Sequence, residues 1–270
     1  MLMKKNYNFI IGLLITALML SLSVMGIFWT PNNPNAIDSS QRFLSPSIQY
    51  PLGTDNFGRC IFSRVVEGTG STILVAAATV AIGFGVGMIV GCFTGYFGGW
   101  SDELLMRTGD VIMAFPSILL ALVFISLIGT GRYNVIIALG ILFIPSFARI
   151  VRGEFVRMRE LDFVQSAKIM GAKPSRIMFV HILPNAVPVM LRNIAIGFNN
   201  AVLAEASMSY LGLGVQPPDA SLGRMLSDSQ PFLFSAPWYA LSAGIAIVLL
   251  ILGFGLISEG ILAQNPSPTA

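Results

Sequence analysis

Ile73-Leu-Val-Ala-Ala-Ala-Thr-Val-Ala-Ile-Gly-Phe-Gly-Val-Gly-Met-Ile-Val-Gly-Cys-Phe-Thr-Gly-Tyr-Phe97 is the stretch of sequence that decides the fold. It contains no charged residue from end to end. A membrane-spanning helix needs roughly 20 predominantly apolar residues to cross the hydrocarbon core of a bilayer. We therefore predict that this stretch spans a membrane as a helix.

Four glycines recur at every fourth position of this stretch: Gly83, Gly87, Gly91 and Gly95. Residues four apart lie on one face of a helix. A face without side chains lets another helix backbone approach closely. We expect a helix-packing face here, either within the chain or toward a partner subunit.

Five more apolar stretches have a comparable length. They predict spans at Phe9–Trp29, Val111–Ile128, Val135–Val151, Ala186–Met208 and Trp238–Ile257. The composition agrees, since 54% of the residues are hydrophobic and only 11% are charged, against roughly 25% charged in a typical soluble domain. We predict an all-α integral membrane protein with about six transmembrane helices rather than a soluble α/β domain. The alternative for the first stretch is a secretory signal peptide, although its apolar run is longer than usual for one.

Pro116 lies inside the third predicted span and Pro145 inside the fourth. A proline inside a helix removes a backbone donor and crowds the preceding turn. We expect a kink at each position, which serves either as a hinge or as a packing feature.

Basic residues divide unevenly between the two sides that six spans create. One side holds Lys4, Lys5, Arg107, Arg149, Arg152, Arg157, Arg159, Lys168, Lys173, Arg176 and Arg192. The other side holds Arg42, Arg59, Arg64, Arg132 and Arg224. Cytoplasmic loops carry the excess of Lys and Arg. The larger group therefore predicts that both termini are cytoplasmic.

The largest predicted cytoplasmic segment, Glu154–Asn185, joins the fourth and fifth spans. Asp162, followed three residues later by Gln165, resembles a capping box with Asp in the usual Ser or Thr position. A short helix is predicted from about Phe163 to Met170. Gly171 suits the left-handed residue that ends such a helix.

A second short helix is predicted to begin near Pro174, because proline suits the first turn, and to end at Pro184. One face of the first helix collects Phe163, Val164, Ala167 and Met170. Ala167 and Gly171 are small enough to admit the surface of another protein. The segment is thus predicted to be a helix pair beside the membrane. An amphipathic pair lying in the membrane interface is the alternative without a docking role.

The run Gln165-Ser-Ala-Lys-Ile-Met-Gly171, followed by His181-Ile-Leu-Pro184, resembles the cytoplasmic loop of binding-protein-dependent ABC importer permeases. The pattern of that family is Glu-Ala-Ala, three residues, Gly, nine residues, then Ile-x-Leu-Pro. This sequence departs from it at Gln165, Ser166 and His181. The resemblance implies that the helix pair sits in a groove on an ATPase subunit. It assigns ATPase coupling to Asp162, Gln165, Ala167, Gly171, His181, Leu183 and Pro184.

Two further segments resemble the dipeptide, oligopeptide and nickel branch of this family. Gly53-Thr-Asp-Asn-Phe-Gly-Arg59 with Ser63-Arg64 is similar to its Gly-Thr-Asp-x-x-Gly-Arg-Asp-x-x-Ser-Arg pattern, with Cys60 where Asp is usual. Ser209-Tyr-Leu-Gly-Leu-Gly-Val-Gln-Pro-Pro218 is similar to Ser-Phe-Leu-Gly-Leu-Gly-x-x-Pro-Pro, with Leu222 where Trp is common. With the loop, these motifs extend the resemblance over nearly the whole chain.

The resemblance implies one half of a translocation pathway in the inner or plasma membrane of a prokaryote. Its implied partners are a second homologous permease, two ATP-binding subunits and an extracytoplasmic substrate-binding protein, with no nucleic acid. Residues 1–70 are expected to form the N-terminal span and an outer loop, and residues 71–265 the permease domain, with the coupling loop at about 154–185. The sequence contains no Gly-x-x-x-x-Gly-Lys-Ser/Thr loop, so ATP hydrolysis is expected on a separate subunit.

Few residues suit catalysis or metal binding. Cys60 and Cys92 offer neither metal-ligand spacing nor a disulfide framework. His181 is the one histidine, and we interpret it as a packing or hydrogen-bonding residue rather than a ligand. We therefore expect no enzyme, no cofactor and no metal site.

Glu205 lies near the outer end of the fifth predicted span. A carboxylate in a membrane is costly and usually faces a cavity or a partner. Glu205 is therefore either a structural hydrogen-bonding residue or a candidate for the translocation path.

An ion-coupled secondary transporter is the main competing function, since it explains six spans and a membrane-embedded Glu205. It leaves the cytoplasmic helix pair unexplained. A membrane-embedded enzyme is a weaker alternative, because the residues for a catalytic constellation are lacking. The cargo stays open between dipeptides, oligopeptides, nickel and a metal chelate, because specificity lies largely in the binding protein.

Overall fold

The computed structural model describes residues 7–264, and within that range it is built of helices and turns, with one isolated bridge but no strand. The helices long and apolar enough to cross a membrane are α1 (Tyr7–Phe28), α2 (Ile61–Phe97), α5 (Arg132–Arg159), the helical segment Pro174–Tyr210 and α10 (Pro237–Gln264). The bent pair α3 (Gly99–Met113) and α4 (Ser117–Ile128) gives up to six spans in the described part. The prediction of an all-α membrane protein with about six helices is confirmed.

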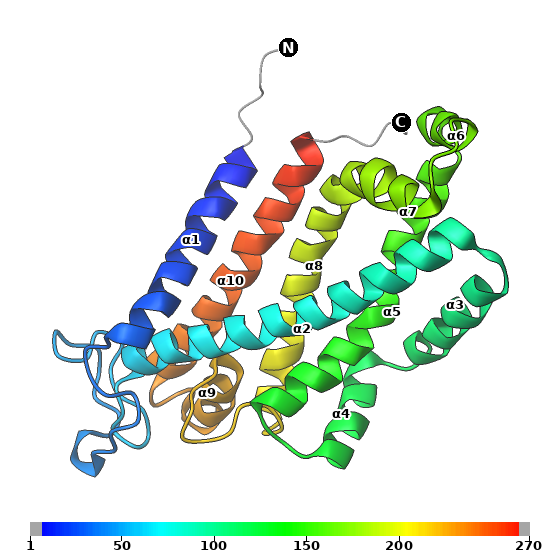
Figure 1. Ribbon diagram of the computed structural model, residues 1–270. Helices are drawn as coiled ribbons and strands as arrows, with labels where there is room; N and C mark the ends of the chain where they lie inside the picture. Colours follow the sequence, from blue (N-terminus) through cyan, green and yellow to red (C-terminus); the bar gives the residue numbers. More distant parts are fainter. Residues whose placement is uncertain (1–6, 265–270) are drawn as a thin grey trace.

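The long helices form one bundle with two distinct ends (Figure 1). Helices α1, α10 and α8 (Leu183–Tyr210) stand side by side. Helix α2 crosses them obliquely and packs along α5. The loop between α1 and α2 lies at one end with α9 (Leu222–Ser229). Helices α6 (Asp162–Ile169) and α7 (Pro174–Arg176) lie at the other end, where α1 begins and α10 finishes.

The glycine stripe of α2 packs against α5. A Cβ added at Gly87 would lie 2.9 Å from the Ile144 carbonyl oxygen, and one at Gly91 would lie 2.6 Å from that of Ala148. Added Cβ atoms at Gly83 and Gly95 would meet the Cβ atoms of Phe143 and Phe155 at 2.7 and 2.6 Å. Such distances leave no room for a side chain. Of the two expectations for this face, the structure supports packing within the chain.

The first helix packs along the last one. A Cβ added at Gly12 would lie 2.8 Å from the Gly253 carbonyl oxygen, and one at Gly253 would lie 2.6 Å from Thr16 Oγ1. The bounds of α1 agree with the predicted span to within two residues at each end. The structure thus makes the first apolar stretch part of the bundle.

The third predicted span is not one kinked helix. The structure divides it into α3 and α4, which meet at an angle of 91°. Pro116 precedes the first residue of α4, and a proline drives the residue before it out of the helical region. In contrast, α5 stays continuous through Pro145 and runs eight residues past its predicted end, from Val151 to Arg159.

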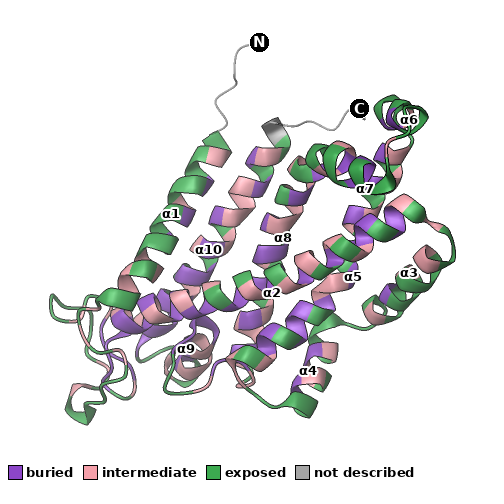
Figure 2. Cartoon of the chain, in the orientation of Figure 1, coloured by how far each residue is buried: buried purple, intermediate pink, exposed green. Residues whose placement is uncertain are grey.

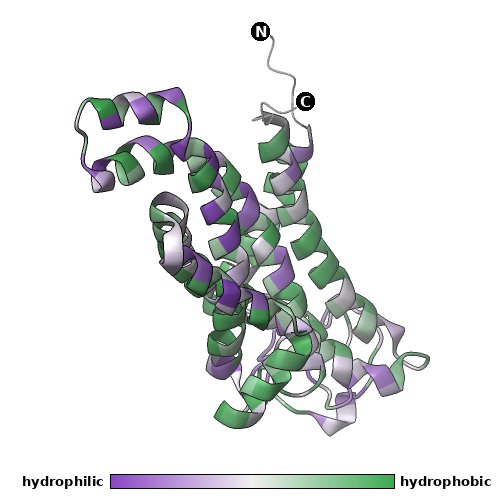
Figure 3. Ribbon diagram, turned by 90° about the vertical axis from the view of Figure 1, so that its right-hand side faces the viewer, coloured by the Kyte–Doolittle hydropathy of each residue, from purple (hydrophilic) through white to green (hydrophobic). Residues whose placement is uncertain are grey.

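Buried side chains concentrate where α2, α5, α8 and α10 face one another (Figure 2). One apolar cluster joins Val80 of α2, Phe147 of α5, Phe198 of α8 and Leu250 of α10. The outward faces of the long helices are also hydrophobic (Figure 3). Apolar residues that face away from the core are expected where the solvent is lipid, so the surface agrees with a membrane-embedded bundle.

The motif from Gly53 to Arg64 folds the outer loop onto the start of α2. The Asp55 carboxylate accepts hydrogen bonds from the backbone N–H groups of Phe57 and Arg59, at 2.8 and 2.9 Å, and it pairs with the side chains of Arg59 and Arg64. Gly58 has a φ of +76°, and a Cβ there would collide with the Asp38 carbonyl oxygen. The motif therefore specifies a loop structure.

Candidate functional site

The helix pair at one end of the bundle begins where α5 leaves it. Helix α6 ends in a Schellman motif: the Gly171 N–H donates to the Lys168 carbonyl oxygen and the Ala172 N–H to that of Ala167, both at 3.0 Å. Gly171 has a φ of +77°, which favours glycine. Pro174 then occupies the first turn of α7. The predicted glycine turn and the predicted start of the second helix are confirmed.

The predicted capping box is wrong. Leu161 precedes the first residue of α6, Asp162 is already helical, and no side chain caps this end. Gln165 Nε2 instead donates to the Arg159 carbonyl oxygen at 3.1 Å. A carbonyl at the end of a helix lacks an intrahelical partner. Gln165 therefore ties α6 to the end of α5 instead of closing its own first turn.

The second helix does not end at Pro184. Residues Ile177–Ile182 form a π-helical segment that carries α7 into α8 without a break. In a regular helix, the ring of Pro184 would clash with the carbonyl of the residue four positions earlier. Here the Leu183 N–H donates to the Met178 carbonyl oxygen, five positions earlier. This wider turn accommodates Pro184.

The pair has an apolar core of its own. Val164 and Ala167 of α6 pack in one cluster with Phe155 of α5 and with Ile177 and Ile182 of the π-helical segment. Ala167 is only 3% exposed. It therefore supports the pair from within, whereas the sequence suggested that it could admit another protein.

The outer surface of the pair is also apolar at its tip. Ile169 and Met170 are 87% and 81% exposed, and Phe163 is exposed beside them. The face that collects Phe163, Val164, Ala167 and Met170 is divided, since Val164 and Ala167 are buried whereas Phe163 and Met170 are exposed. The sequence interpretation missed Ile169. Its place directly before the Met170-Gly171 turn was the available signal, since turn tips project from a surface.

The seven predicted coupling residues occupy three environments. Three of them are exposed: Asp162, Gly171 and Pro184. Three are half-buried, namely Gln165, His181 and Leu183, and Ala167 is buried. The His181 carbonyl oxygen accepts a hydrogen bond from Asn185 Nδ2 at 2.7 Å. The motif thus combines residues that shape the helix pair with residues available to a partner.

Polar contacts hold the end of α5 to its neighbours. Arg159 Nη1 donates to the Tyr96 carbonyl oxygen at 3.2 Å and so caps the end of α2. Arg152 forms a two-point ion pair with Asp102 of α3, with Nη2 and Oδ2 at 2.7 Å. Arg149 pairs with Asp110, which also belongs to α3. These contacts join α5, from which the helix pair projects, to α2 and α3.

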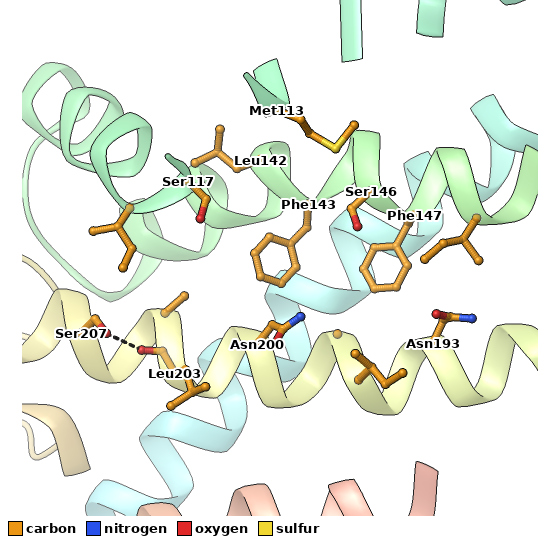
Figure 4. A pocket seen from close by; sticks show the side chains of 15 residues that line it. Met113, Ser117, Leu142, Phe143, Ser146, Phe147, Asn193, Asn200, Leu203 and Ser207 are labelled. Carbon is orange, nitrogen blue, oxygen red and sulfur yellow. Dashed lines mark hydrogen bonds between the residues drawn. The ribbon is translucent and has the colours of Figure 1, made fainter. Parts of the chain in front are cut away.

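A cavity of about 390 Å³ lies between α5, α8 and the break between α3 and α4 (Figure 4). Its size falls within the usual range for small-ligand pockets, roughly 300–1,000 Å³. From α5, the rings of Phe143 and Phe147 project toward α8. Met113 and Ser117 border it from the two sides of the break. None of the described residues that line this cavity is charged.

One stripe of α8 contributes most of the polar lining: Asn193, Asn200 and Ser207. The sequence interpretation missed these residues. Their spacing of seven was the available signal, because residues seven apart lie on one helix face. Asn193 Nδ2 donates to the Val189 carbonyl oxygen at 2.8 Å, and Ser207 Oγ to that of Leu203 at 2.7 Å.

Glu205 lies on another face of α8. At about 100° per residue, it is turned roughly 140° from the polar stripe. Its carboxylate is fully buried and accepts hydrogen bonds from Thr72 Oγ1 at 2.8 Å and Ser209 Oγ at 2.6 Å. Ser209 Oγ also accepts the Val215 N–H at 3.1 Å. Glu205 therefore binds the Ser209–Pro218 motif to α2, and it does not border the cavity.

A bundle of membrane-spanning helices, an uncharged cavity within it and a projecting helix pair at one end define a membrane transport subunit. Residues 87–264 match the family model described as "Binding-protein-dependent transport system inner membrane component". The chain belongs to this family and is a multi-pass permease subunit of an ABC importer. The resemblance found in the three motifs is thereby confirmed, and a secondary transporter is not favoured.

Curated relatives cover most of the chain. The dipeptide transport system permease protein DppC of Alkalihalophilus pseudofirmus is 38% identical over 259 residues, which are 96% of this chain and 85% of that protein. The glutathione transport system permease protein GsiD of Pectobacterium atrosepticum is 37% identical over 84% of this chain and 75% of that protein. A solved chain of the inward-facing MetNI methionine ABC transporter has a TM-score of 0.60 at 20% identity, covering 74% of this chain and 95% of that one. The last comparison supports the fold alone.

Proposed function

We propose that this chain forms one half of an ATP-driven import pathway for short peptides. A second homologous permease would complete the pathway, two ATP-binding subunits would drive it, and an extracytoplasmic binding protein would deliver the cargo. Relatives named for dipeptides and glutathione support a peptide cargo over nickel. A cavity lined by apolar side chains and by a few neutral hydrogen-bonding groups suits a peptide, which presents neutral donors and acceptors.

The projecting helix pair carries the proposal. Its apolar tip, Ile169 and Met170, stands exposed at the end of the bundle where basic residues cluster. Exposed apolar patches rimmed by polar residues often mark protein interaction sites. We assign this tip, with Asp162 and Gly171, to contact with an ATPase subunit. Ala167, Gln165, His181, Leu183 and Pro184 would hold the pair in the shape that the groove receives.

The proposed orientation places this end, with both termini, in the cytoplasm. Single cysteines can test it, because the natural Cys60 and Cys92 are buried. In the subunit produced without its ATPases, which would otherwise cover this residue, Met170→Cys should react with a membrane-impermeant thiol reagent only after the cytoplasmic side is opened. Ile48→Cys, on the exposed loop between α1 and α2, should react in intact cells. The reverse pattern would place the helix pair outside and rule out ATPase docking.

Coupling is tested at Gly171. A Cβ there would meet no atom of this chain within 4 Å, so a larger side chain would extend toward the partner. Its φ of +77° would also strain the backbone of any residue that replaces the glycine. Gly171→Leu should reach the membrane in normal amounts but lose vanadate-sensitive peptide uptake and co-purification with the ATPases. Gly171→Asn is the control for strain, because Asn tolerates the left-handed region.

A second control separates this site from the helix before it. Gly153 of α5 has equally open surroundings and no positive φ. Gly153→Leu should leave uptake close to that of the wild type. Normal uptake by Gly171→Leu, with its ATPases bound, would show that the docking assignment is wrong.

A further inference from the structure

The amide of Asn200 stands apart from the other two polar side chains that α8 contributes to the cavity, Asn193 and Ser207. Asn193 and Ser207, on the same stripe of α8, each donate to a carbonyl of their own helix. Asn200 is exposed to the cavity, and within residues 7–264 its side chain has no hydrogen-bond partner. Asn200 therefore keeps both donors and both acceptor sites of its amide free.

The surroundings of Asn200 are neutral and partly aromatic. The rings of Phe143 and Phe147 project toward α8 near Asn200 (Figure 4). The ring of Phe147 lies directly on Gly197 of α8, where an added Cβ would come within 2.4 Å of it. The described lining offers no charge to bind a peptide terminus or a metal ion. A ligand that this wall recognises must therefore be neutral where it makes contact.

A peptide bond fits this requirement. It presents a neutral N–H donor and a neutral C=O acceptor side by side, and the Asn amide presents the complementary pair. The ring of Phe143, which is half-buried at the cavity, can cover an apolar side chain of the cargo. We propose, building on the peptide-import function above, that Asn200 binds a backbone amide of the cargo as it passes through the pathway. Recognition of the backbone alone lets peptides of different sequence use one path.

The test removes the proposed hydrogen bond either by changing the amide of the cargo or by changing Asn200. The fully assembled importer is supplied with the dipeptide Ala-Phe or with its ester analogue, in which oxygen replaces the amide N–H. Both are used at concentrations that saturate the binding protein, so that its own preference does not affect the rates. Losing a net hydrogen bond to a neutral group reduces a binding constant by roughly two- to tenfold. The wild type should therefore move the dipeptide several-fold faster than the ester.

Asn200→Leu should bring that ratio close to one, because the variant has no amide to distinguish the two cargoes. Asn200→Gln keeps the amide and should restore part of the preference. Asn199→Leu is the matched control, since Asn199 lies beside Gly255 of α10 and does not line the cavity. It should keep the wild-type ratio.

The outcomes separate this inference from the proposed function. A wild type that moves neither cargo would overturn the peptide-import proposal itself. A wild type without preference, or an Asn200→Leu variant that keeps the full preference, would overturn only the assignment to Asn200. ATP hydrolysis stimulated by the loaded binding protein should be equal in all variants. A preference lost together with that stimulation would instead indicate a structural role.

Discussion

Replacing single glycines of α2 by alanine should have opposite effects on stability, depending on the face that they occupy. Alanine is favoured over glycine in a helix interior by about 1 kcal/mol. At Gly85, an added Cβ would meet nothing within 4 Å. Gly85→Ala should therefore leave the free energy of unfolding unchanged or raise it by about 1 kcal/mol.

Gly91 gives the opposite expectation for the same substitution. A Cβ there would lie 2.6 Å from the Ala148 carbonyl oxygen, 2.7 Å from Val151 Cβ and 2.9 Å from the Arg152 nitrogen. Two of these atoms belong to the backbone of α5, so the helix itself would have to move. Overpacking of this kind costs about 1–3 kcal/mol. After the gain in helix propensity, Gly91→Ala should be destabilising by up to about 2 kcal/mol.

The two variants should thus differ by roughly 1–3 kcal/mol in the free energy of unfolding. A difference of 1 kcal/mol shifts the melting temperature of a domain of this size by about 2–4 °C. Heat-induced precipitation of the tagged subunit, in the detergent-extracted importer, would measure this shift. Equal midpoints for Gly85→Ala and Gly91→Ala would refute the close packing of α2 on α5.

Three other experiments address charged and capping positions. Cys60 precedes α2 without a capping hydrogen bond, and an Asp at such a position stabilises a helix by about 1 kcal/mol. Cys60→Asp should therefore raise the melting temperature, and a lower melting temperature would contradict this. Glu205→Gln should keep peptide uptake, whereas Glu205→Leu should lower the free energy of unfolding by about 1–3 kcal/mol, because it leaves buried hydroxyls unpaired. Loss of uptake in a stable Glu205→Gln protein would instead favour a role for Glu205 on the translocation path. In a double-mutant cycle, the partly exposed pair Asp102 and Arg152 should show a coupling energy on the order of 1 kcal/mol or less, and additive effects would contradict the pairing.

The sequence predicted the features that depend on local physics. Long apolar runs identified the spans, and Gly171 with Pro174 identified the turn and the start of the second helix. Each of these depends on the preferences of one residue or on a run of similar residues. The packing face of α2 was recognisable for the same reason, but its partner within the chain was not.

The features that the sequence did not reveal depend on contacts between distant segments. Gln165 looked like part of a cap, yet a carbonyl at the end of α5 offered it a better partner. Pro184 looked like a helix end, yet the π-helical segment before it accommodates the ring. The free amide of Asn200 appears only once α5 and α8 are placed on either side of a cavity. Local patterns define the elements, and tertiary contacts decide which polar groups remain available.

One helix connects the cavity with the projecting helix pair. Helix α5 carries Phe143 and Ser146 at the cavity, and it runs without a break to Arg159, where the helix pair begins. At 1.5 Å per residue, Ser146 and Arg159 are about 20 Å apart along the axis. The glycine stripe of α2 packs closely on α5 along this length, and Arg159 of α5 donates a hydrogen bond to the end of α2. A displacement of the helix pair would therefore reach the cavity through α2 and α5 moving together, and a looser α2–α5 contact should weaken coupling as well as stability.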